Sequence, residues 1–258
     1  METNSLSVGA TGWRLAVLLG FFFGTMALMF WVAPIPQDLA YHAFADRRSL
    51  LGIPNFFDVI SNLPFVLIGI LGVRVSLGRL PRAILPAWLM FFMAVSLVGV
   101  GSAYYHWAPD NDTLVWDRLP MTVGFMSLFV ALLGEYLDRR LVQRLLYPAV
   151  LIGACSVVYW HFMDDLRFYA WVQFMPLTMI AMLLTLYRSR FEQNGLLLIA
   201  LGCYVLAKVV EYYDAEIFQL LGATVSGHTL KHLLASAGCL TMAVLVIKWN
   251  GKHDALPA

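Results

Sequence analysis

The chain has 258 residues, of which 60% are hydrophobic and only 13% are charged. A water-soluble domain covers its core with polar residues, so this composition excludes an ordinary soluble protein. The formal net charge of +1 also argues against a nucleic-acid-binding protein, because such proteins carry a strongly basic surface.

Apolar stretches long enough to cross about 30 Å of hydrocarbon, which takes about 20 helical residues, recur along the chain. Their predicted limits are 13–34, 56–78, 83–107, 114–137, 141–162, 167–188, 195–213 and 227–248. The connections between them are short, which favours one bundle over two domains. The sequence therefore predicts an all-α integral membrane protein with eight transmembrane helices.

The first apolar stretch has two interpretations. Arg14 precedes an apolar run, as in a secretory signal. The run is long, however, and the following segment 31–36 offers no convincing small-x-small cleavage site. We expect an uncleaved helix within an N-terminal segment 1–34, followed by a membrane domain 35–250 and a short cytoplasmic tail 251–258.

The distribution of Arg and Lys predicts the orientation of the bundle. One set of helix ends carries most of the positive charges, namely Arg14, Arg74, Arg79, Arg82, Arg139, Arg140, Arg144, Arg188, Arg190, Lys248 and Lys252. The opposite loops carry fewer, offset by aspartates: Arg47, Arg48, Arg118 and Arg167. Positive residues favour the cytoplasmic side. With an even number of spans, both termini then face the cytoplasm, and a bacterial inner membrane suits so compact a chain.

Polar residues recur at the ends of three of these stretches. Ser102 and His106 end the third stretch, and Asp117 opens the fourth. His228 and His232 open the eighth. Residues four apart share one face of a helix, so each of the two pairs stacks on one side. In the predicted topology all five lie in one layer on the non-cytoplasmic side.

Imidazoles that converge with an open fourth position suit a catalytic zinc ion. The alternative for an isolated His-x-x-x-His is a pair of interfacial histidines bonded to neighbours or lipid headgroups. This alternative is weakened by the presence of Ser102, His106 and Asp117 at the same depth, because polar residues within a span are costly and usually face an interior site. Asp117 or Glu211 could hold the second nitrogen of a histidine ligand. His161 is expected at the interface rather than as a further ligand.

These five residues, in their order and spacing, resemble the core of the alkaline ceramidase family. That family shares a superfamily with the adiponectin/progestin receptors and the GPI-remodelling membrane hydrolases. The stretch 52–62 also resembles the family's first helix, whose Ser-Asn pair is matched by Ser61-Asn62. The resemblance covers about residues 41–248 and implies a seven-transmembrane-helix bundle, here with one extra N-terminal helix.

The resemblance also implies the chemistry. A zinc ion would be held by His106, His228 and His232 together with a water molecule. Asp117 would hold and deprotonate this water, and Ser102 would hydrogen-bond the oxyanion formed when water attacks an amide carbonyl. The expected activity is zinc-dependent cleavage of the amide bond of ceramide or a related N-acyl lipid, which enters laterally between helices. The products would be a free fatty acid and an amine.

A second metal is a weaker expectation. Eukaryotic ceramidases bind calcium through an acidic cluster, which Asp46 and Asn55 match only in part, because Tyr41 and Phe44 stand at other positions of it. The favoured interpretation is a solvated loop in which Asp46 forms a local ion pair with a neighbouring arginine.

Two rival functions stay open. One is a lipid-responsive receptor in which zinc is structural. The other is a retinal-binding photoreceptor, because Lys208 lies inside a late helix and the purified protein would then be coloured. Lys208 and Glu211, three apart on one helix face, predict an internal ion pair. The sequence leaves the lipid headgroup, the acyl length and the oligomeric state open.

Overall fold

The computed structural model describes residues 6–187 and 194–249, with side chains from Gly12 onward. Within this part of the chain, eight helices are long and apolar enough to cross a membrane. They are α1 (Leu6–Trp31), the consecutive pair α2 (Phe56–Ile60) and α3 (Leu63–Arg79), α4 (Leu85–Trp107), α5 (Asn111–Tyr136), α6 (Arg140–Met163), α7 (Arg167–Leu186), α8 (Asn194–Tyr212) and α10 (Gly227–Ile247). A 3-10 turn, η1 (Leu39–His42), and a short helix, α9 (Asp214–Leu220), complete the fold. The all-α architecture is confirmed, and the eight candidate spans coincide with the predicted stretches.

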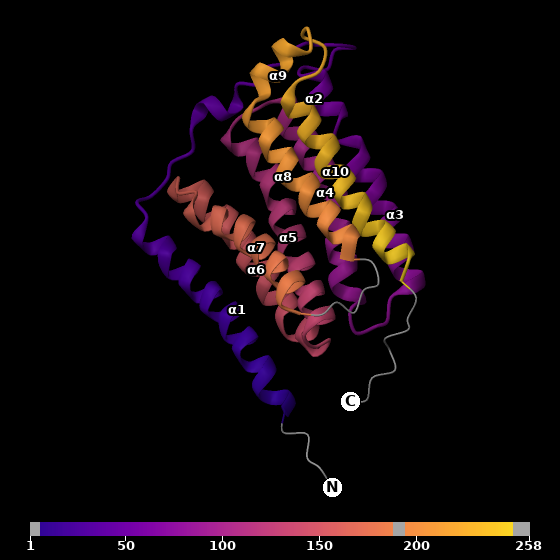
Figure 1. Cartoon of the computed structure of the whole chain (residues 1–258). Coiled ribbons are helices and arrows are strands. Elements are labelled where there is room, and N and C mark those ends of the chain that lie inside the picture. The colour runs from indigo at the N-terminus through magenta and orange to yellow at the C-terminus, as the bar shows by residue number, and fades with distance from the viewer. Residues whose placement is uncertain (1–5, 188–193, 250–258) are drawn as a thin grey trace.

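Figure 1 shows how these helices are arranged. Helix α4 packs between α3 and α5, and α10 packs against both α8 and α3. Helix α1 lies along α7 at the outer edge of the bundle. The beginning of α1 and the end of α10 lie at one end, here called the lower end, and α2 and α9 lie at the opposite, upper end (Figure 1).

Polar bonds fix α1 to the bundle near its last turn. The Arg167 guanidinium donates to backbone carbonyl groups at the end of α1, and Trp171 Nε1 donates to Thr25 Oγ1 over 3.1 Å. Arg167 also pairs with Asp165 at 2.7 Å, and its hydrogen bonds lower the pKa of Asp165 to about 2. Helix α1 ends at Trp31, shortly before two prolines that cannot continue it.

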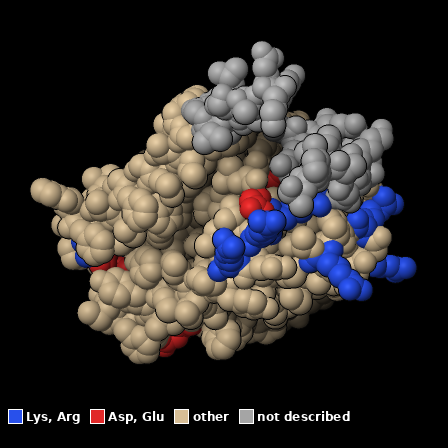
Figure 2. Space-filling view, turned by 90° about the horizontal axis from the view of Figure 1, so that it is seen from below, with Lys and Arg blue, Asp and Glu red and all other residues tan. Residues whose placement is uncertain are grey.

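The lower end is the basic one. Figure 2 views the molecule from this end and shows Lys and Arg side chains gathered there. The positive residues exposed near the lower helix ends are Arg74, Arg79, Arg82, Arg140, Arg144 and Lys248. Arg188, Arg190, Lys252 and the predicted tail 251–258 lie outside the described residues.

Arg118 differs from its predicted place among the loop charges. Helix α5 begins at Asn111, earlier than expected, because Asp110 and Thr113 form a capping box. Arg118, which the predicted stretch 114–137 already included, lies inside the helix, where it is buried and donates to Gln37 Oε1 over 2.8 Å. The rings of Trp160 and other aromatic residues surround its guanidinium.

Candidate metal centre

Three buried histidines meet at the upper end of the bundle. His106 comes from the last turn of α4, whereas His228 and His232 come from the first turns of α10. Their ligand nitrogens all lie within 4.8 Å of one another, and the Nε2 atoms of His106 and His228 are 3.2 Å apart. Nitrogens bound tetrahedrally to zinc at 2.0–2.1 Å would be about 3.3 Å apart. The cluster therefore fits a metal ion of this size.

The outer nitrogen of His232 is held by Ser61. The apolar run predicted as one helix breaks between α2 and α3, just before Pro64, and this break places Ser61 Oγ 2.7 Å from Nδ1 of His232. Ser61 donates its own proton to the backbone oxygen of Asp58, so Nδ1 of His232 must be the donor in the first bond. Nε2 of His232 is then a free acceptor, and it is buried without a hydrogen-bond partner among the described residues. This is the second-nitrogen support that metal-binding histidines need, and for His232 it comes from Ser61 and not from Asp117 or Glu211.

The start of α10 is fixed by three local features. Ser226 caps the helix, because its hydroxyl accepts from the backbone N–H of Thr229 over 3.0 Å. Gly227 lets α10 approach α8, since a Cβ there would lie 2.1 Å from the carbonyl oxygen of Val210. The backbone N–H of His228 donates to Asp214 Oδ1 over 2.7 Å. These contacts set the height and rotation of the two α10 histidines.

Ser102 and Asp117 meet beside the histidines, in the layer predicted for them. The side chains of Ser102 and Asp117 are both buried. Helices α4 and α5 cross closely here, because a Cβ at Gly101 would lie 2.0 Å from the carbonyl oxygen of Trp116. Ser102 and Asp117 line the same cavity as His232. A carboxylate and a hydroxyl therefore face the space next to the candidate metal site.

The segment before α2 covers the histidines from above. The Phe44 ring lies with its centroid 4.6 Å from that of His106 and 4.8 Å from that of His228. The backbone N–H of Ala45 donates to Asp214 Oδ2 over 2.9 Å, so one carboxylate ties this cover to the start of α10. Sequence reasoning missed Phe44 in this role, because it lies in an irregular segment whose path no periodicity predicts.

The predicted ion pair of Asp46 is confirmed, with Arg48 as its partner, but the prediction of a solvated loop is wrong for Asp46, whose side chain is buried. The guanidinium donates over 2.8 Å to Oδ1 and over 2.6 Å to Oδ2. Burial raises the pKa of Asp46, but the hydrogen bonds from Arg48 outweigh it and hold the pKa below its usual value. Asn55 donates its amide to the backbone oxygen of His106 over 2.8 Å. With Asp46 bonded to an arginine and Asn55 turned to the histidine helix, this arrangement does not favour a calcium ion.

The predicted ion pair of Lys208 and Glu211 is also confirmed, at 2.7 Å. The sequence analysis did not predict a third member of this group of charges. Lys231, between the two α10 histidines, places its Nζ 2.7 Å from Glu211 Oε1 and 3.2 Å from Nε2 of His228. The sequence carried a signal, since Lys231 is a charged residue inside a predicted span.

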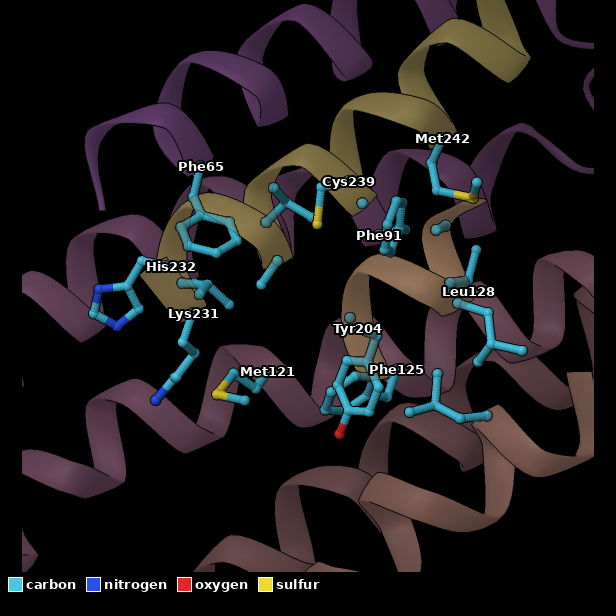
Figure 3. Close-up of a pocket in the computed structure, with 18 of the residues that line it drawn as sticks. Phe65, Phe91, Met121, Phe125, Leu128, Tyr204, Lys231, His232, Cys239 and Met242 are labelled. Atoms are coloured by element: carbon cyan, nitrogen blue, oxygen red, sulfur yellow. The ribbon is translucent and has the colours of Figure 1, made fainter. Parts of the chain in front are cut away.

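An apolar cavity descends from this polar layer. Figure 3 shows His232 and Lys231 at one end of it and Leu128 and Met242 towards the other. A second, lateral groove lies between α7 and α8 and shares Tyr204 and two leucines with the lining of the cavity. The cavity therefore extends away from the polar layer, and the groove lies beside it.

The sequence also matches a known protein family. A family model described as Ceramidase matches residues 52–254. This range spans α2 to α10 and therefore includes the three histidines, Ser61, Ser102 and Asp117, but not the segment before α2 that covers the histidines. No curated protein matches the chain.

Proposed function

The chain belongs to the ceramidase family, and on this premise we propose that it is a zinc-dependent intramembrane hydrolase of a lipid amide. Membership of the family implies amide hydrolysis and a lipid substrate. The substrate class that we propose is ceramide or a related N-acyl lipid, cleaved to a free fatty acid and an amine. The observation that carries the metal dependence is the cluster of His106, His228 and His232, with the unpartnered Nε2 of His232 directed away from Ser61.

Zinc bound by the three histidines would polarise the amide carbonyl and lower the pKa of its water to about 7. Asp117, beside the cluster, accepts the proton of the attacking water and returns it to the leaving amine. Ser102 turns its hydroxyl to the carbonyl oxygen as negative charge develops there, which is worth about 3 kcal/mol for one such donor. Phe44 excludes bulk water from above.

The apolar cavity is the proposed site of the acyl chain. Its lining follows α5 from Asp117 to Leu132, a rise of about 22 Å at 1.5 Å per residue. That length exceeds one leaflet of a hydrocarbon core about 30 Å thick, so it suits a long acyl chain. The scissile amide would then lie at the polar end, next to Ser102 and Asp117.

The lateral groove between α7 and α8 is the proposed entry route. Its lining comes from both helices and is mostly apolar, with Lys208 as its charged member, and Gln173 bridges the two helices by donating to Tyr204 Oη over 2.8 Å. A lipid moving through the groove would pass Tyr204, whose side chain lines both spaces. Breaking one hydrogen bond would widen the passage without unfolding either helix.

We further propose that both termini face the cytoplasm and that the metal centre faces the periplasm or lumen, as in a bacterial inner-membrane protein. The basic lower end supports this orientation. Cysteine labelling from either side, at engineered cysteines in the two terminal segments, tests it. Labelling of the two ends from opposite sides would show that α1 does not cross the membrane.

Elemental analysis of the purified protein tests the metal. The proposal predicts about one zinc per chain, and preparations without any bound transition metal would refute it. The alternative, a lipid-responsive receptor with structural zinc, shares this result and is separated by product release.

A further inference from the structure

Lys231, Glu211 and Lys208 form a continuous row of charges, here called the charged bridge. Lys231 Nζ donates to Glu211 Oε1, and Lys208 Nζ donates to Glu211 Oε2, each over 2.7 Å. The row begins beside the metal centre, since Lys231 Nζ is 3.2 Å from Nε2 of His228. One carboxylate thus holds two ammonium groups.

The charged bridge connects the cavity to the lateral groove. Lys231 lines the cavity together with Asp117 and His232, as Figure 3 shows for Lys231 and His232. Lys208 lines the groove between α7 and α8. The Lys208 side chain is 37% exposed, against 16% for Lys231, so Lys208 is the outer member.

The charges of the bridge do not balance. A single lysine would neutralise Glu211, yet two are present, and both lie in membrane-spanning helices where unpaired charge is costly. The other carboxylate nearby, Asp117, lines the cavity next to the metal cluster, whose ion would add further positive charge. One positive charge of the bridge is therefore available to a ligand.

We propose that the charged bridge recognises an acidic group, a carboxylate or a phosphate, on the amine half of the lipid substrate. This inference rests on the proposed function. With the acyl chain in the apolar cavity and the amide at Ser102 and Asp117, the amine half extends towards the groove. Lys208 meets its acidic group there, and Glu211 positions both lysines. The preferred substrate is then an anionic N-acyl lipid, and neutral ceramide is a poorer one.

The test uses the purified, zinc-loaded full chain and lipids that share one acyl chain. Two pairs separate the sources of the charge: an N-acyl amino acid against its methyl ester, and an N-acyl sphingoid base 1-phosphate against the unphosphorylated base. Binding and kcat/KM are measured for each lipid. We expect at least one acidic lipid to bind about tenfold more tightly than its neutral partner and to have a kcat/KM about tenfold higher. A factor of this size is what one hydrogen bond to a charged group contributes.

Variants assign the preference to the bridge. Lys208→Gln should reduce the acid-to-neutral ratio about tenfold, and Lys208→Arg, which keeps the charge, should retain most of it. Lys248→Gln is the matched control, because this exposed lysine lies at the lower end of the bundle. The ratio should be unchanged in it.

Three outcomes separate this inference from the proposed function. Equal binding of acid and neutral partner by the unmodified chain overturns the charged bridge as a recognition site, whether or not the lipids are cleaved. A preference that survives Lys208→Gln does the same. Tighter binding of an acid without cleavage of any lipid would keep the recognition site and refute the hydrolase.

Discussion

The upper and lower halves of the bundle differ in what they bury. The lower half encloses large apolar side chains: Trp88, Phe92, Leu132, Leu146, Leu183 and Met242. The upper half buries a layer of polar groups, several of which are hydrogen-bonded across helices: Asp58, Ser61, Ser102, His106, Asp117, Ser226, His228, Thr229 and His232. The lower half has buried polar residues too, among them Ser76, but no comparable cluster of histidines and carboxylates is found among the described residues.

The two halves therefore differ in role: the lower half stabilises the fold, and the upper half carries the residues proposed for catalysis. Apolar packing can be satisfied by many side chains of suitable volume. A buried polar layer is costly unless each group has a partner, so its unpartnered atoms call for a ligand. Substitutions in the upper half should therefore change metal binding or turnover, whereas substitutions in the lower half should change which acyl chain fits.

The largest effect is expected from removing a histidine of the cluster. His228→Ala or His232→Ala should remove most of the zinc and lower turnover to about 1% or less, because a zinc-activated water is lost with the metal. Elemental analysis and a product assay measure the two losses. His161→Ala is the control, since this histidine lies at the same end but pairs with Asp112 at 3.8 Å. Full zinc in both cluster variants would refute the assignment.

Asp117→Asn should keep the metal and lose turnover by about 100-fold or more, in the range that a general base supplies. The amide of asparagine cannot take a proton from water. Zinc content and kcat are measured on the same preparation. Unchanged kcat would remove Asp117 from the proposed mechanism.

Ser102→Ala should also keep the metal, with a loss of kcat similar to that of Asp117→Asn or smaller, because only an oxyanion donor is removed. The comparison with Asp117→Asn uses the same assay. A loss that appears in KM alone would assign Ser102 to substrate binding instead.

Ser61→Ala should weaken zinc affinity about 10- to 100-fold, because Nδ1 of His232 loses the acceptor that orients the ring. Competition with a chelator of known affinity measures it. Ser76→Ala, a buried serine on α3 below the polar layer, is the matched control. Equal zinc affinity in the two variants would show that Ser61 does not support the ligand.

The smallest effect is expected in the lower half. Cys239→Phe should fill part of the apolar cavity and lower kcat/KM about tenfold for long acyl chains while sparing short ones. Cys155→Phe, at an exposed cysteine of α6, should leave the chain-length profile unchanged. An unaltered profile in Cys239→Phe would place the acyl chain elsewhere.

Much of the fold was predictable because a bilayer restricts what can cross it. Long apolar stretches must be helices there, and their limits can be read from the sequence to within a few residues. The break between α2 and α3, which lies at the polar pair Ser61-Asn62 just before Pro64, was not predicted. Helix α9 is short, and the capping box starts α5 earlier than predicted.

The site was predictable where the spacing of residues along one helix determines which side chains share a face. His228 and His232, or Ser102 and His106, share a face whatever the packing. The partners from other segments depend on how helices rotate against one another. Three contacts therefore emerge only from the three-dimensional structure: the hydrogen bond of Ser61 with His232, the packing of Phe44 on the histidines, and the ion pair of Lys231 with Glu211.

The central claim is metal-dependent cleavage of a lipid amide in the upper half of the bundle. Lipid mass spectrometry of the purified chain, incubated with a panel of N-acyl lipids, tests it most directly. The claim predicts release of free fatty acid and the matching amine, abolished by a zinc chelator and restored by added zinc. No fatty acid from any lipid of the panel, or release that persists without metal, would contradict it.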